Sequence, residues 1–276
     1  MRPARGRLGG GVALALALAL SQLIGPAGCD AGRAAPGQGG RDVAAAGASV
    51  AARHDAAVAR LAATRQRLAA AWPDADEAGR AALVGQARAA LWPAVADELM
   101  PAWLGMPWGM GRTSTATSPH QPGMQISCSY FVAAVLQSAG LHLRDRFALG
   151  QAPALTIQRS LVGENHAAVH RYPSISPAEL ADRIRRLGDG LYLIGLNIHV
   201  GFVVVRAGQV RFVHASYTGD QRVSDEPLAS SRAIANSQPA GYFVSPLVVA
   251  PGGADEATST WLLRQWIVGA VVGPSR

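Results

Sequence analysis

The spacing of apolar residues changes from helical to strand-like along the chain. Apolar residues recur at helical intervals from Val50 to Trp72 and again from about Asp76 to Leu91, and Pro73 separates the two stretches. From Leu191 onwards, apolar residues follow the period of two that is typical of strands. Helices that precede strands in this way predict an α+β fold with an antiparallel sheet.

The same pattern predicts the bounds of the shorter elements. Strands are expected at Leu191–Leu196, Ile198–Val205, Val210–Ala215 and Tyr242–Val249. Helices are expected at Ala154–Leu161, at Pro177–Leu187 and around Trp261–Val268. Residues 104–124 are rich in glycine and proline and are expected to form a loop.

The segment 125–140, QISCSYFVAAVLQSAG, is expected to be a helix with a cysteine in its first turn. Ser127 suits the N-cap, and Gly140 suits the end of the helix. The inward apolar face should hold Cys128, Phe131, Val132 and Val135. The positive end of the helix dipole would favour the thiolate of Cys128 and make it a nucleophile. The alternative is that Cys128 is only a small buried hydrophobic residue.

Two histidines lie in a predicted hairpin, HVGFVVVRAGQVRFVHAS, over residues 199–216. A turn centred on residues 207–208 sets His214 opposite Gly201, so His199 and His214 become diagonal neighbours on one face. An odd-numbered turn would put them on opposite faces. Gly201, without a side chain, should leave room for a substrate or for the cysteine helix.

One thiol and two imidazoles suit nucleophilic catalysis. One imidazole can take the thiol proton, and the other can orient the first. The candidate site therefore consists of Cys128, His199 and His214. The alternative is a pair of unrelated structural histidines. One thiol and two imidazoles could also serve as zinc ligands. An unpaired thiol at the start of a helix, however, favours a nucleophilic role for Cys128, so no metal or other cofactor is expected.

The N-terminus has the features of a bacterial export signal. Arginines at positions 2, 5 and 7 precede an apolar run, Val12–Ile24, which is too short to span a membrane comfortably. The following GPAGCD resembles a lipoprotein signal in which residues 1–28 are removed and Cys29 is lipidated, although Pro26 stands where leucine is usual. By analogy with such lipoproteins, Asp30 implies retention at the inner membrane. The alternative is a plain secreted protein that is cleaved nearby.

Lipidation of Cys29 would leave Cys128 without a disulfide partner, because the chain has only two cysteines. It would also make the membrane a partner of the protein. Loss of the three signal arginines reduces the formal charge of +7 to +4 (7 − 3). The remaining arginines are scattered, so nucleic acid is not an expected partner.

The predicted organisation has five parts. They are a signal peptide at 1–28, a flexible tether at 29–48, a helical segment at 49–100, a catalytic domain at 101–250 and a tail with a helix at 251–276. The helical segment is expected to be an alanine-rich hairpin that packs beside the catalytic domain.

Three segments in order, LGMPWGMG, SCSYFVAAVLQSAG and HVGFVVVRAGQVRFVHAS, resemble the NlpC-like cell-wall cysteine peptidases, a bacterial branch of the papain-like fold. The resemblance covers roughly residues 104–250. It implies a papain-like core in which the cysteine helix packs on the antiparallel sheet. Carried over by position, Cys128 would be the nucleophile, His199 the base and His214 the orienting residue.

The chain departs from the family pattern at three positions. Ser127 replaces the usual aspartate, and Tyr130 replaces the usual glycine. Trp108 stands where the family tends to have a tyrosine that helps to stabilise the oxyanion, so an indole N–H would have to serve. These changes leave the expected nucleophile and base in place but put the substrate class in doubt.

The resemblance implies an exported thiol hydrolase that cleaves amide bonds in peptidoglycan peptides through a thioester. Trp108 and Gly201 would lie at the substrate or oxyanion. One alternative is an amidase or acyltransferase that acts on another acyl compound. The other is a non-catalytic envelope lipoprotein that uses the fold as a binding module, for which alkylation of Cys128 would leave function unchanged.

Overall fold

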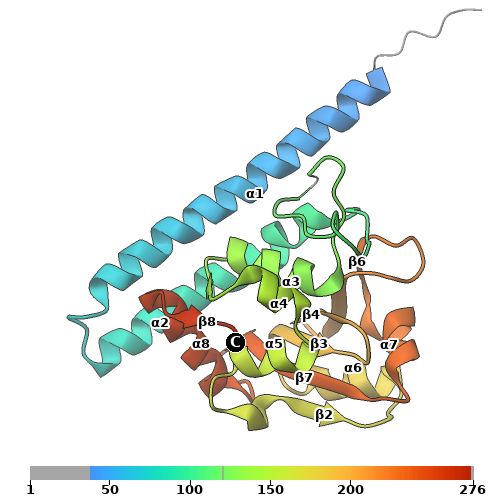
Figure 1. The fold of residues 1–276 in the computed structure, drawn as a ribbon. Coiled ribbons are helices and arrows are strands. Elements are labelled where there is room, and N and C mark those ends of the chain that lie inside the picture. Colours follow the sequence, from blue (N-terminus) through green and yellow to red (C-terminus); the bar gives the residue numbers. More distant parts are fainter. Residues whose placement is uncertain (1–37, 120, 275–276) are drawn as a thin grey trace, which may run out of the picture.

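A computed structural model describes residues 38–119 and 121–274, with side chains from residue 49. The predicted signal peptide, Cys29 and Asp30 lie outside the described residues. The described chain is α+β, as predicted, with helices on both faces of an antiparallel sheet (Figure 1). None of its helices is both long and apolar enough to cross a membrane.

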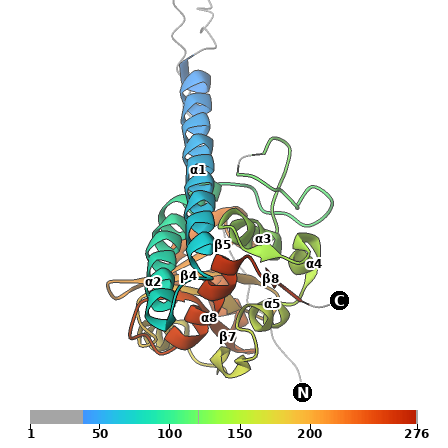
Figure 2. The same cartoon turned by 90° about the vertical axis from the view of Figure 1, so that its left-hand side faces the viewer.

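The predicted helical hairpin consists of α1 (Gln38–Ala71) and α2 (Glu77–Pro93). A π-helical turn, η1 (Ala94–Leu99), and a 3-10 turn, η2 (Pro101–Trp103), follow. Helix α1 starts before the expected position 49 and includes part of the predicted tether, because alanine is the strongest helix former. In both views its N-terminal end projects beyond the rest of the molecule (Figures 1 and 2).

The main sheet has the strand order β2-β7-β3-β4-β5-β6, and all neighbouring strands are antiparallel. Its strands are β2 (His170–Tyr172), β3 (Gly190–Gly195), β4 (Val200–Arg206), β5 (Gln209–Ala215), β6 (Val223–Pro227) and β7 (Tyr242–Val249). A separate parallel pair consists of β1 (His142–Leu143) and β8 (Val271–Val272). The sequence pattern missed β2 and β6 because both are short edge strands with exposed polar residues.

The hairpin of β4 and β5 has the predicted register. Phe202 pairs with Val213 and Val203 with Phe212, so the next position sets His214 opposite Gly201. The turn residues Ala207 and Gly208 both have positive φ, as the two-residue turn of a twisted hairpin requires. The two histidines therefore share one face of the sheet.

Each face of the sheet is covered by a different set of helices. Helix α3 (Cys128–Ser138) packs on β4 and β5, and α4 (Arg146–Gln151), α5 (Ala154–Leu161) and α8 (Glu256–Val268) lie on the same side. The 3-10 turn η3 (His166–Ala168) follows α5. The opposite face carries α6 (Pro177–Arg185), the turn η4 (Leu228–Ser230) and α7 (Arg232–Ser237).

One hydrophobic core joins the helical hairpin to the rest of the protein. The rings of Trp103, Phe131 and Phe202 meet edge to face, at centroid distances of 6.1 and 5.7 Å, and so connect η2, α3 and β4. The same core continues from Ala57 on α1 to Val272 on β8. The predicted divisions at 100/101 and 250/251 therefore coincide with no break in packing.

Candidate active site

Helix α3 places Cys128 in its first turn, with Phe131, Val132 and Val135 fully buried as predicted. It ends at Gly140, which has φ +87°. The N–H of Leu141 donates to the carbonyl of Leu136 in a Schellman motif.

The prediction of Ser127 as the N-cap of this helix is confirmed. Ser127 is the N-cap residue, but its hydroxyl accepts no capping hydrogen bond. Its side chain lines a cavity instead. The first N–H groups of α3 are therefore not satisfied by the cap side chain.

The cavity has a volume of about 650 Å³ and contains both the candidate nucleophile and the candidate base. The loop before α3, the first turn of α3, the end of α4, the β3–β4 turn and the segment after β5 form its wall. Its described lining residues are Trp108, Met110, Gly111, Ser114, Ser127, Cys128, Ser129, Tyr130, Gly150, Gln151, Ile198, His199 and Tyr217.

His199, His214 and Glu226 form a series of side chains linked by hydrogen bonds. Nε2 of His199 lies 2.8 Å from Nδ1 of His214, and Nε2 of His214 lies 3.2 Å from Oε1 of Glu226. Both histidines are buried, whereas Glu226 is half-buried. The other ring nitrogen of His199, Nδ1, is buried and has no hydrogen-bond partner among the described residues.

Burial makes both imidazoles weaker bases. It lowers the pKa of His199 well below the ordinary value of 6.5, and the neighbouring His214 lowers it further. Burial also lowers the pKa of His214, although Glu226 opposes this shift through its hydrogen bond and its charge. The hydrogen bond from His214 in turn lowers the pKa of Glu226. Near neutral pH the series therefore holds two neutral rings and one carboxylate.

The expected thiolate at Cys128 is not what the structure supports. Burial raises the pKa of the thiol above its ordinary value of 9.0. Hydrogen bonds from the backbone N–H groups of Val200, Ser129 and Cys128 itself lower the pKa, but they do not outweigh burial. The resting pair is therefore a neutral thiol and a neutral imidazole. Val200, whose N–H is one of the groups that lower the pKa, follows His199 directly in the sequence and is the first residue of β4.

The structure brings Cys128, His199 and His214 together, whereas Gly201 lies opposite His214 but outside the cavity lining. A Cβ on Gly201 would lie 2.6 Å from the Phe212 ring and 2.8 Å from Cβ of His214. Gly201 does not line the cavity. The expectation that it leaves room for substrate is therefore wrong, because the space is taken by two side chains of β5.

Trp108 lines the cavity, as predicted. Its indole N–H, however, is buried and has no hydrogen-bond partner among the described residues. Its ring lies 6.4 Å from that of Tyr217, which in turn lies 5.2 Å from the ring of His199. Tyr217 thus supplies the cavity with a phenol group that was not predicted from the sequence.

Sequence reasoning also missed Glu226. Strand β6 pairs with β5 so that Glu226 is opposite Phe212 and Ser224 is opposite His214. Glu226 therefore lies diagonal to His214 on the same face. The only sequence signal for Glu226 would have been polar residues that alternate with a period of two on both β5 and β6. That signal could be used only if β6 had been recognised as a strand.

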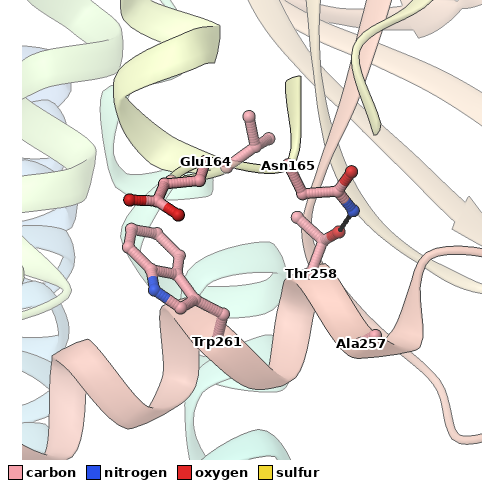
Figure 3. A pocket seen from close by; sticks show the side chains of 7 residues that line it. Glu164, Asn165, Ala257, Thr258 and Trp261 are labelled. Atoms are coloured by element: carbon pink, nitrogen blue, oxygen red, sulfur yellow. Dashed lines mark hydrogen bonds between the residues drawn. The ribbon is translucent and has the colours of Figure 1, made fainter. Parts of the chain in front are cut away.

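A second hollow lies between the segment after α5 and helix α8 (Figure 3). There Asn165 donates a hydrogen bond to Thr258, and the Glu164 carboxylate lies beside the Trp261 ring. It holds neither a cysteine nor a histidine among its lining residues, so the cavity at Cys128 is the candidate active site. In the part of the chain that the structure describes, no cluster of three or more histidine, cysteine or acidic residues is arranged to hold a metal ion.

Comparisons with protein-family models, with curated proteins and with solved structures found no match.

Proposed function

We propose that the protein is a thiol-dependent hydrolase with a papain-like core that cleaves amide bonds through a thioester intermediate. The observation that carries the proposal is the free Nδ1 of His199, a buried base atom in the same cavity as the Cys128 thiol. A buried polar atom without a partner is costly, so an unpartnered ring nitrogen on a residue that lines the same cavity as a thiol is typical of a reaction centre.

The carboxylate of Glu226 determines which nitrogen atoms carry protons. It can only accept, so Nε2 of His214 donates to it. In neutral His214, Nδ1 is then a lone pair, which accepts the N–H at Nε2 of His199. Nδ1 of His199 is left as a lone pair. This is the protonation state that a general base requires.

In the proposed reaction, Nδ1 of His199 takes the thiol proton while the sulfur of Cys128 attacks an amide carbonyl. The positive charge that forms on His199 is stabilised by Glu226 through His214. The backbone N–H of Cys128, in the first turn of α3, would donate to the developing oxyanion. His199 then gives its proton to the leaving amine, and water hydrolyses the thioester.

A raised thiol pKa is compatible with this mechanism. A neutral thiol and a neutral imidazole exchange the proton during attack, so no thiolate needs to exist beforehand. The depressed pKa of His199 keeps the base unprotonated down to mildly acidic pH. The cost is a weaker base, which the charge of Glu226 partly offsets.

The physiological part of the proposal rests on the NlpC-like motifs and the N-terminal signal. They favour an exported lipoprotein, anchored in the membrane through Cys29, whose substrates are peptidoglycan peptides. An amidase or acyltransferase for another acyl compound uses the same Cys128, His199 and His214 chemistry. Product analysis distinguishes the two.

The test is covalent trapping of an acyl-enzyme. A Cys29→Ala variant, which retains Cys128 as its single thiol, is incubated with peptidoglycan peptides and with activated esters and analysed by intact mass. We expect a Cys128 adduct and turnover, both abolished by Cys128→Ala. If Cys128 forms no adduct and its alkylation changes no measurable function, the protein is a binding module and the hydrolase proposal fails.

A further inference from the structure

We infer that the acyl group accepted by the cavity is uncharged and apolar. The inference rests on the proposed function, because it names the substrate class of the same site. It starts from the wall of the cavity. None of the described lining residues is an aspartate, glutamate, lysine or arginine. A charge on a bound acyl group would be desolvated there without an ionic partner, which is costly.

Two exposed apolar side chains lie at this cavity. Met110, on the loop before α3, is 81% exposed, and Ile198, beside His199, is 72% exposed. Single exposed apolar residues need no explanation, but two from separate segments at one cavity indicate a binding surface. The rings of Trp108, Tyr130 and Tyr217 extend the apolar wall inward. An apolar chain bound there would remove both exposed side chains from water.

The nearest arginines in sequence do not supply the missing charge. Arg146 is buried and does not line the cavity. One of its terminal nitrogens donates to the carbonyls of Thr115 and Ala116, and its guanidinium lies behind the wall, 5.7 Å from the centroid of the Tyr130 ring. Arg112 follows Gly111 but does not line the cavity. The polar groups of the wall are neutral: the hydroxyls of serines and tyrosines and the amide of Gln151. Such groups suit a carbonyl, not a carboxylate.

An adjoining hollow of about 200 Å³ has the same character. It shares Ile198 and Tyr217 with the main cavity and adds the amide side chains of Asn197 and Asn236, again without a charged lining residue. A leaving group that extends into it would meet neutral hydrogen-bonding groups. The described linings of both hollows therefore hold no charged side chain that could pair with a carboxylate next to the reacting carbonyl.

Two kinds of substrate carry an uncharged apolar acyl group. One is a fatty-acyl compound, and the other is a peptide with an apolar residue on the acyl side of the cleaved bond. Turnover of 4-nitrophenyl esters by the full chain separates them. We expect kcat/KM to rise by about 10²-fold from acetyl to octanoyl, since each of the six added methylenes adds about twofold when it is only partly buried. Glutaryl, which carries a carboxylate, is expected to fall about 10-fold below butyryl. An N-acetyl-leucyl ester that exceeds octanoyl identifies the peptidyl source.

Measurement of ligand binding tests the inference independently of turnover. The Cys128→Ala full chain is titrated by calorimetry with octanamide, with N-acetyl-leucinamide and with glutaramate. Tighter binding of either apolar amide than of glutaramate supports the inference even if the ester assay shows no reaction. Equal or tighter binding of glutaramate overturns it. If turnover depends on Cys128 but is faster for the glutaryl ester than for the apolar esters, the inference fails and the proposed hydrolase stands. If no ester is turned over but the apolar amides bind more tightly than glutaramate, the proposed hydrolase fails and the inference stands.

Charge variants test the wall itself. Met110→Arg puts a cation at the cavity and is expected to raise the glutaryl-to-octanoyl ratio of kcat/KM, or of binding constants, about 10-fold. Val268→Arg is the matched control, because Val268 is an exposed apolar residue on α8 that does not line the cavity. An unchanged ratio in Met110→Arg, or an equal change in Val268→Arg, contradicts the inference.

Discussion

Nε2 of His199 lies 2.8 Å from Nδ1 of His214, and Nδ1 of His199 is then the ring nitrogen without a hydrogen-bond partner among the described residues. Glu226 determines the direction of the hydrogen bond between the two rings. Because the carboxylate accepts from Nε2 of His214, Nδ1 of His214 must accept from Nε2 of His199. His199 directly precedes β4, whereas His214 lies on β5 and Glu226 on β6. A change at β6 should therefore alter the chemistry at Cys128 without contact with the substrate.

Glu226→Gln should lower kcat by about 10- to 10²-fold with little change in KM, because an amide no longer dictates the protonated nitrogen of His214. Loss of the carboxylate also removes the group that raises the pKa of His214. The acidic limb of the kcat/KM profile should accordingly move to lower pH.

The matched control for this change is Asp225→Asn. Asp225 is the neighbouring carboxylate on β6, is exposed and pairs with Arg211. It should leave both kcat and the pH profile unchanged. Equal effects of the two substitutions would mean that β6 acts only through stability.

His214→Asn should retain more activity than His214→Ala. The side-chain oxygen of asparagine can accept the N–H at Nε2 of His199, so the lone pair at Nδ1 is preserved. Alanine leaves that N–H buried and unpaired, at a cost of about 1–3 kcal/mol, and frees the ring to rotate. Steady-state kinetics of both variants, compared at equal folded fraction, measure the difference. Equal activities would show that His214 does not orient His199.

Alkylation of Cys128 by iodoacetamide, in the Cys29→Ala background, should accelerate with pH up to and beyond 9.0, the ordinary thiol value, because burial raises its pKa. The thiolate is the reactive form, so a raised pKa means slow alkylation at neutral pH. A rate that is already pH-independent near neutrality would reveal a thiolate–imidazolium pair. In that case the helix dipole and the N–H groups at the sulfur would outweigh burial.

Gly201→Ala should destabilise the protein by about 1–3 kcal/mol and also reduce activity, since the new Cβ would collide with Phe212 and His214. Gly190→Ala is the control. Its Cβ would lie 2.8 Å from Cα of Val249, a comparable collision away from the cavity. Chemical denaturation and kcat should show that both variants lose stability but that only Gly201→Ala loses activity per folded molecule.

His170 and Asp255 form an ion pair, 2.8 Å long, between β2 and the start of α8. The hydrogen bond to Asp255 raises the pKa of His170. A raised folded-state pKa contributes stability that is fully present below the unfolded value of about 6.5 and is lost as the pH rises through the folded value. His170→Gln should therefore cost about 1 kcal/mol in acid and progressively less in alkali.

Urea denaturation across this pH range measures the His170 effect. The control is His166→Gln, an exposed histidine on the nearby η3 turn. A cost for His170→Gln that does not vary with pH would contradict the ion pair.

The local sequence determined the parts of the fold that depend on near neighbours. The apolar face and the glycine end of the Cys128 helix follow from helical spacing, and the register of His199 and His214 follows from a two-residue turn. Both features arise within about twenty residues of chain, so the pattern alone predicted them. The helical hairpin was predicted for the same reason.

Tertiary structure decided the rest. Glu226 reaches His214 only because β6 pairs with β5 at the sheet edge, a contact that no local period encodes. The pKa of Cys128 depends on how deeply the sulfur is buried, and packing overrides the dipole that the sequence suggested. Gly201 has its role because two side chains of β5 fill the space beside it. Pairing and desolvation are properties of segments brought together. For that reason the sequence alone predicted the candidate nucleophile and the two histidines but not Glu226, which hydrogen-bonds to His214.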